Sequence, residues 1–159
     1  MTSIRPAVAA DGPALVALDR ATWSPENAVV PRWPEDTDFF ARRPPEDVLV
    51  AQGGGRVLGY TALGRPTPLD ANRHVWHVQG LAVDPAAQRQ GIARRLLDAA
   101  VAEATRRGAR KLGLRVLGGN TAARALYARA GFTVEGVLRE EFHLGGAFVD
   151  DVLMARPLP

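Results

Sequence analysis

The sequence predicts a mixed α/β (α+β) fold, in which a central sheet of about seven strands carries helices on both faces. Two observations support this prediction. Strand-like apolar runs and helix-like amphipathic stretches follow one another in the order β-α-α-β-β-β-α-β-α-β-β. Gly53-Gly54-Gly55 stands between two of the strand-like runs and is typical of a hairpin turn. The chain has no internal repeat and no low-complexity tract.

The first third of the chain is predicted to contain one strand and two helices. Ser3 to Val8 forms the strand, and the Asp11 side chain caps a helix that runs to about Thr22. Ser24 to Pro45 is rich in proline and acidic residues. We expect a short second helix there, around Glu35 to Ala41, between two loops.

The middle of the chain is predicted to contain three strands and the longest helix. The strands are Val48 to Gln52, Arg56 to Leu63 and, after a polar loop, His74 to Val83. Gln88 to Arg107 has the apolar period of an amphipathic helix, and Gly108 ends it. The apolar stripe of this helix consists of Ile92, Leu96, Leu97, Ala100, Val101 and Ala104.

The last third is predicted to add one helix and three strands. A strand over Lys111 to Val116 precedes a helix over Thr121 to Ala130. Two further strands, Phe132 to Leu138 and Phe142 to Met154, complete the chain. Gly145-Gly146 is expected to interrupt the second of them.

Composition limits the possible functions. The 159 residues, 47% of them hydrophobic, are expected to form a single domain over residues 1–159. Without cysteine the chain has no disulfide, no thiolate metal ligand and no cysteine nucleophile. Three scattered histidines do not favour a metal site, so no metal is expected. No apolar run approaches the roughly 20 residues that span a bilayer, and no secretory signal is recognised, so we expect a cytoplasmic protein without a membrane partner.

The positive charge does not predict a nucleic-acid partner. The net charge is +3 and the pI is about 10.1, values that can accompany nucleic-acid binding. Nearly all of the positive charge is arginine, with Lys111 the single lysine, and acidic residues are interspersed throughout. No basic block with interleaved aromatic residues is present, so we expect a solvated surface with one anion pocket and no nucleic acid.

The anion pocket is predicted at Gln88-Arg89-Gln90-Gly91-Ile92-Ala93, between an apolar strand and the long helix. The first backbone N–H groups of a helix have no partner within it and lie at the positive end of the helix dipole, where they bind anions. Gly91 removes a Cβ where a ligand must approach the backbone, and Arg89, Arg94 and Arg95 add cationic side chains. An ordinary strand–loop–helix junction is the alternative. The segment lacks the GxxxxGK[ST] and GxGxxG patterns, which favours a diphosphate site of another kind.

Gln88-x-x-Gly91-x-Ala93 resembles a signature of the GCN5-related N-acetyltransferase (GNAT) superfamily, whose members transfer an acetyl group from acetyl-CoA to an amine. Asn120-x6-Tyr127-x3-Gly131-Phe132 resembles a second signature of the same family. The resemblance covers about a third of the chain, from Gln79 to Phe132. It implies a mostly antiparallel sheet in which two central strands, here His74–Val83 and Lys111–Val116, splay apart and leave a slot for the pantetheine arm.

The resemblance also implies a co-substrate, acetyl-CoA, and the residues that bind it. Backbone groups of Leu81, Ala82 and Val83 are expected to hold the pantetheine as an added strand would, and one of their amides to stabilise the developing oxyanion. Asn120 matches the family asparagine that contacts the cofactor; a helix N-cap is its simpler role, and both can hold. The diphosphate is expected at the backbone amides of Arg89, Gln90, Gly91, Ile92, Ala93 and Arg94.

Tyr127 is the candidate general acid. It matches the family tyrosine that lies near the sulfur and donates a proton to the departing thiolate. Leu126 and Ala130 turn apolar sides inward beside it, so a core tyrosine with a satisfied hydroxyl is the alternative.

His77 is the candidate general base. Strict alternation places His77, Gln79, Leu81 and Val83 on one face of their strand. The position of His77 resembles that of the catalytic glutamate of histone acetyltransferases and of a histidine of serotonin acetyltransferase. A free imidazole with a pKa near 6.5 accepts a proton at neutral pH. A structural histidine, a water bound by Gln79 and an acidic side chain stay open as alternatives.

Arg115 departs from one branch of the family. Ribosomal-protein alanine acetyltransferases carry a glutamate base five residues before the asparagine, and an arginine cannot accept a proton. A close functional match to that branch is therefore not expected. The C-terminal run looks more like small-molecule amine and amino-acid acetyltransferases. Glu141, Asp150 and Asp151 could help to bind a cationic acceptor there, although charge at a hairpin edge is their usual explanation.

The resemblance implies an acetyl-CoA-dependent N-acetyltransferase in which a primary amine attacks the thioester directly. The acceptor, a small molecule, an amino acid or a peptide, is expected to enter beside residues 23–45 and the hairpin at Gly145. Trp23, Trp33 and Phe39 either line that entrance or belong to the core. The alternative function is a non-catalytic acyl-CoA-binding sensor. A homodimer is possible by analogy with the family.

Overall fold

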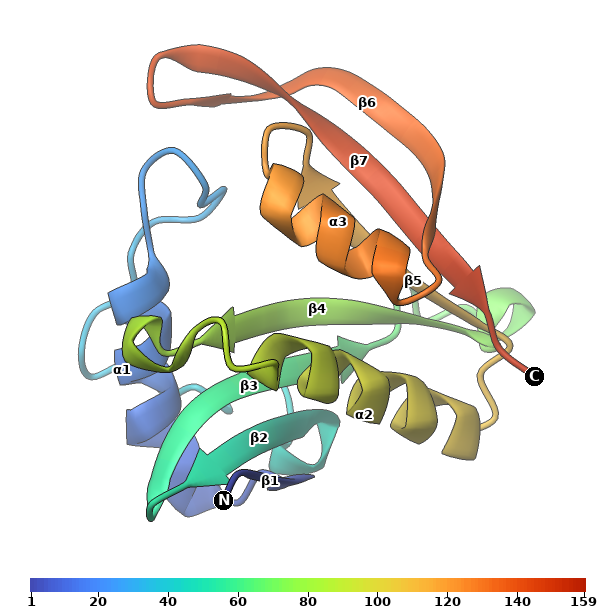
Figure 1. Cartoon of the computed structure of the whole chain (residues 1–159). Helices are drawn as coiled ribbons and strands as arrows, with labels where there is room; N and C mark the ends of the chain where they lie inside the picture. Colours follow the sequence, from blue (N-terminus) through green and yellow to red (C-terminus); the bar gives the residue numbers. More distant parts are fainter.

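A single seven-stranded sheet, in the order β1-β2-β3-β4-β5-β7-β6, forms the centre of the computed structural model, which describes every residue from Met1 to Pro159 (Figure 1). All neighbouring strands are antiparallel except β4 and β5, which are parallel. This arrangement confirms the mixed, mostly antiparallel sheet. The strands are β1 (Ser3–Pro6), β2 (Val48–Gly53), β3 (Arg56–Gly64), β4 (Val75–Val83), β5 (Lys111–Leu117), β6 (Thr133–Leu144) and β7 (Ala147–Pro157).

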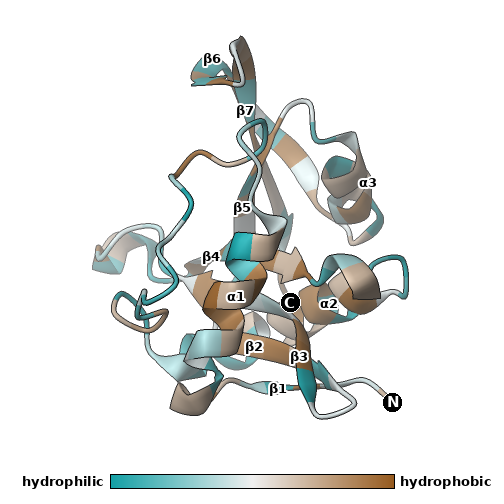
Figure 2. Cartoon of the chain, turned by 90° about the vertical axis from the view of Figure 1, so that its left-hand side faces the viewer, coloured by the Kyte–Doolittle hydropathy of each residue, from teal (hydrophilic) through white to brown (hydrophobic).

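Three helices cover the two faces of this sheet. α1 (Gly12–Thr22) packs on one face, where its Leu15 and Val16 join the buried Val50 of β2. α2 (Ile92–Arg106) and α3 (Thr121–Arg129) pack on the other face. Figure 2 shows hydrophobic residues gathered where α1 and α2 meet the strands. Burial of these apolar side chains is the main favourable contribution to folding.

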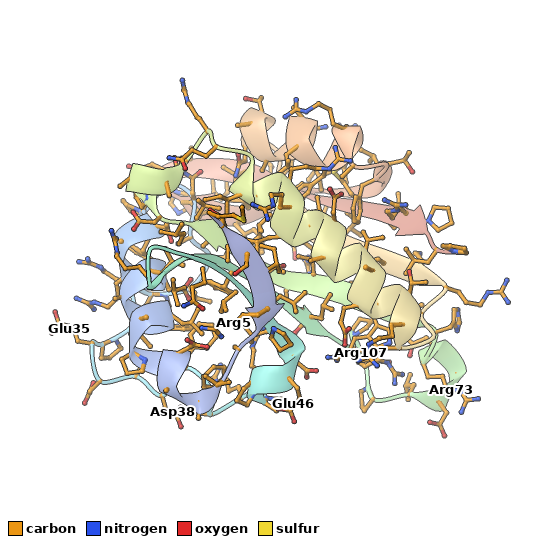
Figure 3. The ribbon with its side chains drawn as sticks, turned by 60° about the horizontal axis from the view of Figure 1, so that its bottom comes forward. Arg5, Glu35, Asp38, Glu46, Arg73 and Arg107 are labelled. Atoms are coloured by element: carbon orange, nitrogen blue, oxygen red, sulfur yellow. The ribbon has the colours of Figure 1, made fainter.

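The C-terminal end of α2 is fastened to the sheet by Arg107 (Figure 3). The guanidinium pairs with Asp47 and donates to the Glu46 carbonyl at 2.6 Å, just before β2 begins. The same guanidinium lies 5.1 Å from the centre of the Trp76 ring on β4. One side chain therefore links α2 to both the second and the fourth strand.

The expected cap of α1 is wrong. Asp11 makes no side-chain capping bond. Its carboxylate instead accepts hydrogen bonds from both terminal nitrogens of Arg5, at 2.8 and 2.9 Å, and from the Val8 amide at 2.8 Å. The bond from Arg5 is the main reason why the pKa of Asp11 is lowered. A bidentate arginine from β1 thus takes the carboxylate that the sequence assigned to the helix.

The helix expected over Glu35 to Ala41 does not form. The chain makes two successive turns instead, closed by hydrogen bonds from the Thr37 amide to the Pro34 carbonyl and from the Ala41 amide to the Asp38 carbonyl, both 3.2 Å (Figure 3). The Asp38 carboxylate also accepts from the Phe40 amide at 3.0 Å. Such a local side-chain bond competes with the helical pattern.

The C-terminal hairpin differs from its prediction in where it turns. The strands run on to the turn at Gly145-Gly146, whereas a break was expected after Leu138. Between Leu138 and Phe142 the register between β6 and β7 shifts, and β6 bulges. The Glu140 amide within the bulge donates to the Asp150 carboxylate at 2.9 Å. A bulge interrupts the pairing without ending the strand, so it resembles a loop in the sequence.

The buried ring of Phe132 anchors α3 to the sheet. It is 2% exposed and meets the Tyr127 ring edge-on, with 6.1 Å between ring centres. We expect Phe132→Ala to lower the free energy of unfolding by about 3–5 kcal/mol, because it leaves a cavity in the core. Urea denaturation measures the change. Val137→Ala, at a position 45% exposed, is the control and should stay within about 0.5 kcal/mol of the wild type. Equal effects of the two substitutions would contradict this account of the core.

Candidate active site

The site lies where β4 and β5 separate. The two strands pair over only three residues each, Val75–His77 with Lys111–Gly113. The register between β3 and β4 shifts at Gln79, which pairs with no residue of β3. A bulge of this kind bends its strand and increases the local twist. From Val78 onward, the edge of β4 that faces β5 therefore has no neighbouring strand.

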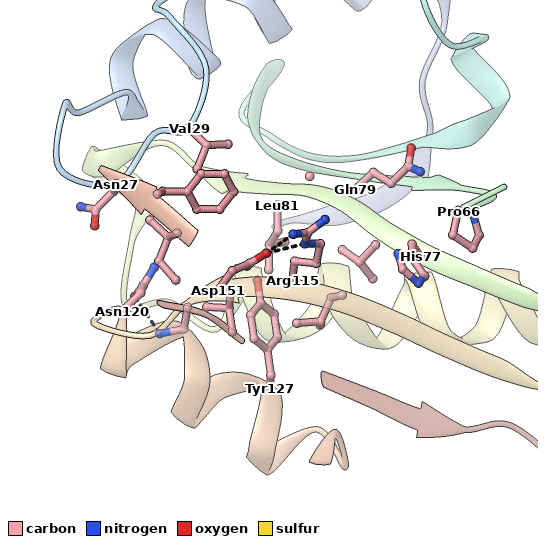
Figure 4. A pocket seen from close by; sticks show the side chains of 17 residues that line it. Asn27, Val29, Pro66, His77, Gln79, Leu81, Arg115, Asn120, Tyr127 and Asp151 are labelled. Atoms are coloured by element: carbon pink, nitrogen blue, oxygen red, sulfur yellow. Dashed lines mark hydrogen bonds and ion pairs between the residues drawn. The ribbon is translucent and has the colours of Figure 1, made fainter. Parts of the chain in front are cut away.

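A cavity of about 630 Å³ occupies the gap between the two strands (Figure 4). The slot expected between splayed central strands is thereby confirmed. Its lining residues come from both strands, from β6 and β7, from α3 and from three connecting segments. They are Asn27, Val29, Pro66, His77, Val78, Gln79, Gly80, Leu81, Leu114, Arg115, Val116, Leu117, Asn120, Ala123, Tyr127, Phe142 and Asp151.

The bulge overturns one expectation about β4: His77, Gln79, Leu81 and Val83 do not share a face. Trp76 packs against the core under α2, so His77 beside it points to the α1 face. Beyond the bulge, Leu81 and Val83 pack on the α2 side. One inserted residue reverses the inward and outward positions of a strand. His77 and Leu81 consequently reach the cavity from opposite faces of the sheet.

His77 sits over β5 at a residue that has no side chain. A Cβ added at Gly113 would lie 2.8 Å from His77 Nε2, so the imidazole occupies space that any larger residue would need. Burial lowers the pKa of His77, and the positive charges of Lys111 and Arg115 lower it further. An imidazole with a lowered pKa is neutral at pH 7 and can accept a proton.

Tyr127 reaches the cavity from α3, on the opposite side of the sheet from His77. Its ring is 8% exposed, and burial raises the pKa of the phenol. The hydroxyl has no hydrogen-bond partner in the protein, and Figure 4 shows it pointing into the cavity. A core tyrosine would have a satisfied hydroxyl. Tyr127 instead presents a protonated donor to whatever fills the slot.

Asn120 lies at the first turn of α3 and lines the same cavity. Its Oδ1 accepts a hydrogen bond from the Ala123 amide at 3.1 Å, so the expected N-cap is present. The side-chain NH₂ group makes no hydrogen bond within the protein and remains available to a ligand.

The loop before α2 is longer than predicted, because the helix begins at Ile92 rather than at Gln88. Arg89 and Gly91 have positive φ angles, 63° and 78°, which are incompatible with a helical start. None of the backbone N–H groups of residues 89–94 donates to an acceptor in the protein. All of these residues except Gln90 line a second cavity of about 350 Å³, next to the start of a helix. The geometry matches an anion site.

The arginines of this segment are not equally available. Arg94 donates to Asp98 at 2.9 Å and to the Arg129 carbonyl at 3.1 Å, which ties α2 to the end of α3. The side chain of Arg89 has no partner in the protein and lines the second cavity. The loop itself is held by Gln88, whose Nε2 donates to the Val83 carbonyl at 3.3 Å. Of Gln88, Arg89 and Arg94, only Arg89 therefore has a side chain that is free to reach an anion.

An ion pair that the sequence did not reveal lies at the centre of the main cavity. Arg115 Nε donates to Asp151 Oδ2 at 2.5 Å, and a terminal nitrogen of Arg115 pairs with the same oxygen (Figure 4). Asp151 is 2% exposed. It is therefore a buried carboxylate of the site and not an edge charge. The other two acidic candidates, Glu141 and Asp150, do not line the cavity.

The aromatic residues expected near the acceptor entrance lie elsewhere. Phe39 is buried in the core under α1 and meets the Trp33 ring edge-on. Trp23 and Trp33 line a separate cavity of about 180 Å³. The entrance itself is formed by Asn27 and Val29, which could not be selected from the sequence because loop residues follow no period.

The entrance is closed on one side by a contact between two distant segments. A Cβ on Gly145, at the turn of the β6–β7 hairpin, would lie 3.2 Å from Glu26 Cγ. Residues 23–45 and this hairpin thus meet at Glu26 and Gly145. The structure contains no group of three or more His, Cys, Asp or Glu side chains that could hold a metal ion. None of its helices has the length and apolar character needed to cross a membrane.

Comparison with known proteins agrees with this geometry. Residues 13–132 match the model of the acetyltransferase (GNAT) family. A phosphinothricin N-acetyltransferase of Alcaligenes faecalis is 34% identical over 131 residues, which are 79% of this chain and 66% of that protein. The chain spans between about a third and two thirds of the length of the curated relatives it matches.

Solved structures share the fold over the whole chain. The ribosomal-protein-alanine N-acetyltransferase from Brucella melitensis has a TM-score of 0.82 and 30% identity, and the match covers 98% of this chain and 99% of that one. The yncA structure from Salmonella typhimurium, solved with its cofactor acetyl-CoA, has a TM-score of 0.88 and covers 100% of this chain and 95% of that one. Because the identity is only 24%, this match shows that the fold is shared and nothing more.

The environment of His77 generates a prediction about its titration. We expect NMR to give an imidazole pKa below the ordinary value of about 6.5, with the resonance assigned by its absence in His77→Gln. Arg115→Gln removes a nearby positive charge and should raise that pKa. The pKa should still stay below the ordinary value, because burial is the largest cause of the shift. A wild-type pKa above the ordinary value would contradict this description of the site.

Proposed function

The chain belongs to the acetyltransferase (GNAT) family, and on that basis we propose that it is an acetyl-CoA-dependent N-acetyltransferase that acts on a primary amine. The observation that carries the proposal is the slot between β4 and β5. The slot brings a neutral imidazole from one face of the sheet and a protonated phenol from the other to the same cavity. Acetyl transfer to an amine needs a proton acceptor and a proton donor in this arrangement.

The cofactor-binding residues fit a long, anionic ligand. The free backbone N–H groups of residues 89–94 suit a diphosphate, with the Arg89 side chain beside them. The unpaired edge of β4 at Leu81, Ala82 and Val83 suits a pantetheine arm, which would add to the sheet as a strand does. The free NH₂ group of Asn120 is a further donor. Bound there, acetyl-CoA supplies the acetyl group as a thioester.

In the proposed reaction His77 takes the proton that the acceptor ammonium must lose. The neutral imidazole is ready for this at pH 7, because burial and two nearby cations lower its pKa. A backbone amide of β4 stabilises the charge that develops on the carbonyl oxygen. The amine nitrogen forms a bond to the carbonyl carbon, the C–S bond breaks, and Tyr127 Oη gives its proton to the departing sulfur. The second proton that the nitrogen loses restores the phenol of Tyr127. The chain has no cysteine, so the amine is proposed to attack directly rather than through an acyl-cysteine.

The proposal has three further parts. The enzyme is a single domain over residues 1–159, works in the cytoplasm and requires no metal. Its partners are acetyl-CoA and the amine, without nucleic acid or a membrane. A homodimer is the assembly to test, by light scattering on the purified protein.

Tyr127→Phe tests the catalytic part of the proposal. The substitution keeps the buried ring and removes the proton donor, so kcat should fall by about 10²–10⁴. The affinity for coenzyme A, measured by calorimetry, should stay unchanged. Thiol release from acetyl-CoA with a panel of amines gives kcat. If the wild-type protein binds coenzyme A but releases no thiol with any amine, the chain is a sensor and not an enzyme.

Arg89→Ala tests the diphosphate site. Arg89 is the free cation of the loop, so its loss should weaken coenzyme A binding roughly three- to tenfold, and the difference should shrink as salt is added. Arg95→Ala is the matched control, because the Arg95 side chain donates to the Thr2 carbonyl at 2.7 Å and does not line the cavity. Calorimetry that finds the two variants equal would place the diphosphate elsewhere.

A further inference from the structure

The ion pair of Arg115 and Asp151 uses only part of its hydrogen-bonding capacity. Both contacts of the guanidinium go to one oxygen, Asp151 Oδ2, through Nε and one terminal nitrogen. The other terminal nitrogen, Nη1, has no acceptor in the protein. A guanidinium carries five N–H donors in a fixed fork. The Arg115 side chain is 50% exposed, and Figure 4 shows one nitrogen turned away from Asp151 into the cavity.

This free edge lies on the acceptor side of the slot. Leu112, Leu114 and Val116 of β5 point into the core under α2 and α3. The alternate residues, Gly113 and Arg115, point to the opposite face. His77 lies over Gly113 on that same face. Arg115 therefore stands two residues along β5 from Gly113, the residue over which His77, the proposed proton acceptor, lies.

The charges of this face disfavour a polycationic acceptor. No carboxylate that lines the cavity is free, because Asp151 is already paired with Arg115. The second nearby cation, Lys111, is paired with Glu135 at 2.8 Å. An acceptor that brings only positive charge would find no unpaired carboxylate on this face. An acceptor that carries an anion next to its amine would fill the open donor positions of Arg115.

Building on the proposed acetyltransferase function, we propose that the acceptor is a free α-amino acid, whose carboxylate is bound by the open edge of Arg115. Asp151 holds the inner edge of the guanidinium and so fixes the direction of the fork. The amine, one carbon away from the bound carboxylate, is thereby kept on the face where His77 lies. A peptide N-terminus, a polyamine and a simple alkylamine lack the anion at this position.

The first experiment compares acceptors that share a side chain and differ in the carboxylate. The twenty standard amino acids and their amides are screened by thiol release from acetyl-CoA. The best acid is then compared with its amide and its decarboxylated amine; for leucine these are leucinamide and 3-methylbutylamine. We expect kcat/KM for the acid to exceed that for the other two about ten- to one-hundredfold, as for a charge-assisted hydrogen bond.

Substitutions at Arg115 test whether that residue causes the preference. Arg115→Gln should raise KM for the acid by a similar factor and should change KM for the amide much less. The double variant Arg115→Gln, Asp151→Asn should behave alike, and it avoids leaving a buried carboxylate without a partner. Arg115→Glu should reverse the preference. Arg73→Gln is the matched control, because Arg73 is exposed, makes no ion pair and does not line the cavity (Figure 3).

A binding measurement keeps this inference separate from the proposed function. Calorimetry titrates acids and amides into the protein saturated with coenzyme A, with no need for turnover. Acids that bind more tightly than amides, with the difference lost in Arg115→Gln, support the inference even if transfer is slow. Amides that bind or react as well as acids would overturn it and leave the acetyltransferase function intact. Failure to bind any acid would overturn it as well, whereas failure to bind coenzyme A would refute the proposed function itself.

Discussion

The bulge at Gln79 is the constraint on which the site depends. One unpaired residue bends β4, so that its pairing with β5 ends at His77 and a cavity opens in the middle of a sheet that is otherwise continuous. The same inserted residue turns His77 and Leu81 to opposite faces. Without it, β4 and β5 would pair along their length, and no ligand could reach the backbone of β4. The fastening of α2 by Arg107 holds the paired end of β4 in place while the other end diverges.

Local patterns in the sequence were enough to predict much of the fold and part of the site. The helix over α2 and the hairpin at Gly53-Gly54-Gly55 follow from patterns within short segments, and Gly91 and Tyr127 stand in segments that resemble the family signatures. The bulge at Gln79 could not be predicted, because it depends on the register with β3. The cap by Asp11 failed for a similar reason, since Arg5 on another element binds the carboxylate. The positive φ angles at Arg89 and Gly91 likewise could not be predicted from the helical period of the apolar residues.

The Arg115–Asp151 pair shows how a charged site can be concealed in a sequence. The two residues are 36 positions apart and lie on strands that are neighbours only in the folded sheet. Each reads alone as an exposed strand charge. The apolar period of Leu112, Leu114 and Val116 does indicate that Arg115 leaves the core, but not what it meets. Burial of Asp151 makes the partner obligatory, because a lone carboxylate at that depth would be strongly destabilising.

Side chains from both faces of the sheet line the gap between β4 and β5, since His77 and Tyr127 reach it from opposite sides. The sheet therefore lies between its two faces, and side chains from both faces meet at the gap between β4 and β5. For the proposed reaction, the thioester approaches from the side of α2 and α3 and the amine from the side of α1, so neither molecule obstructs the path of the other.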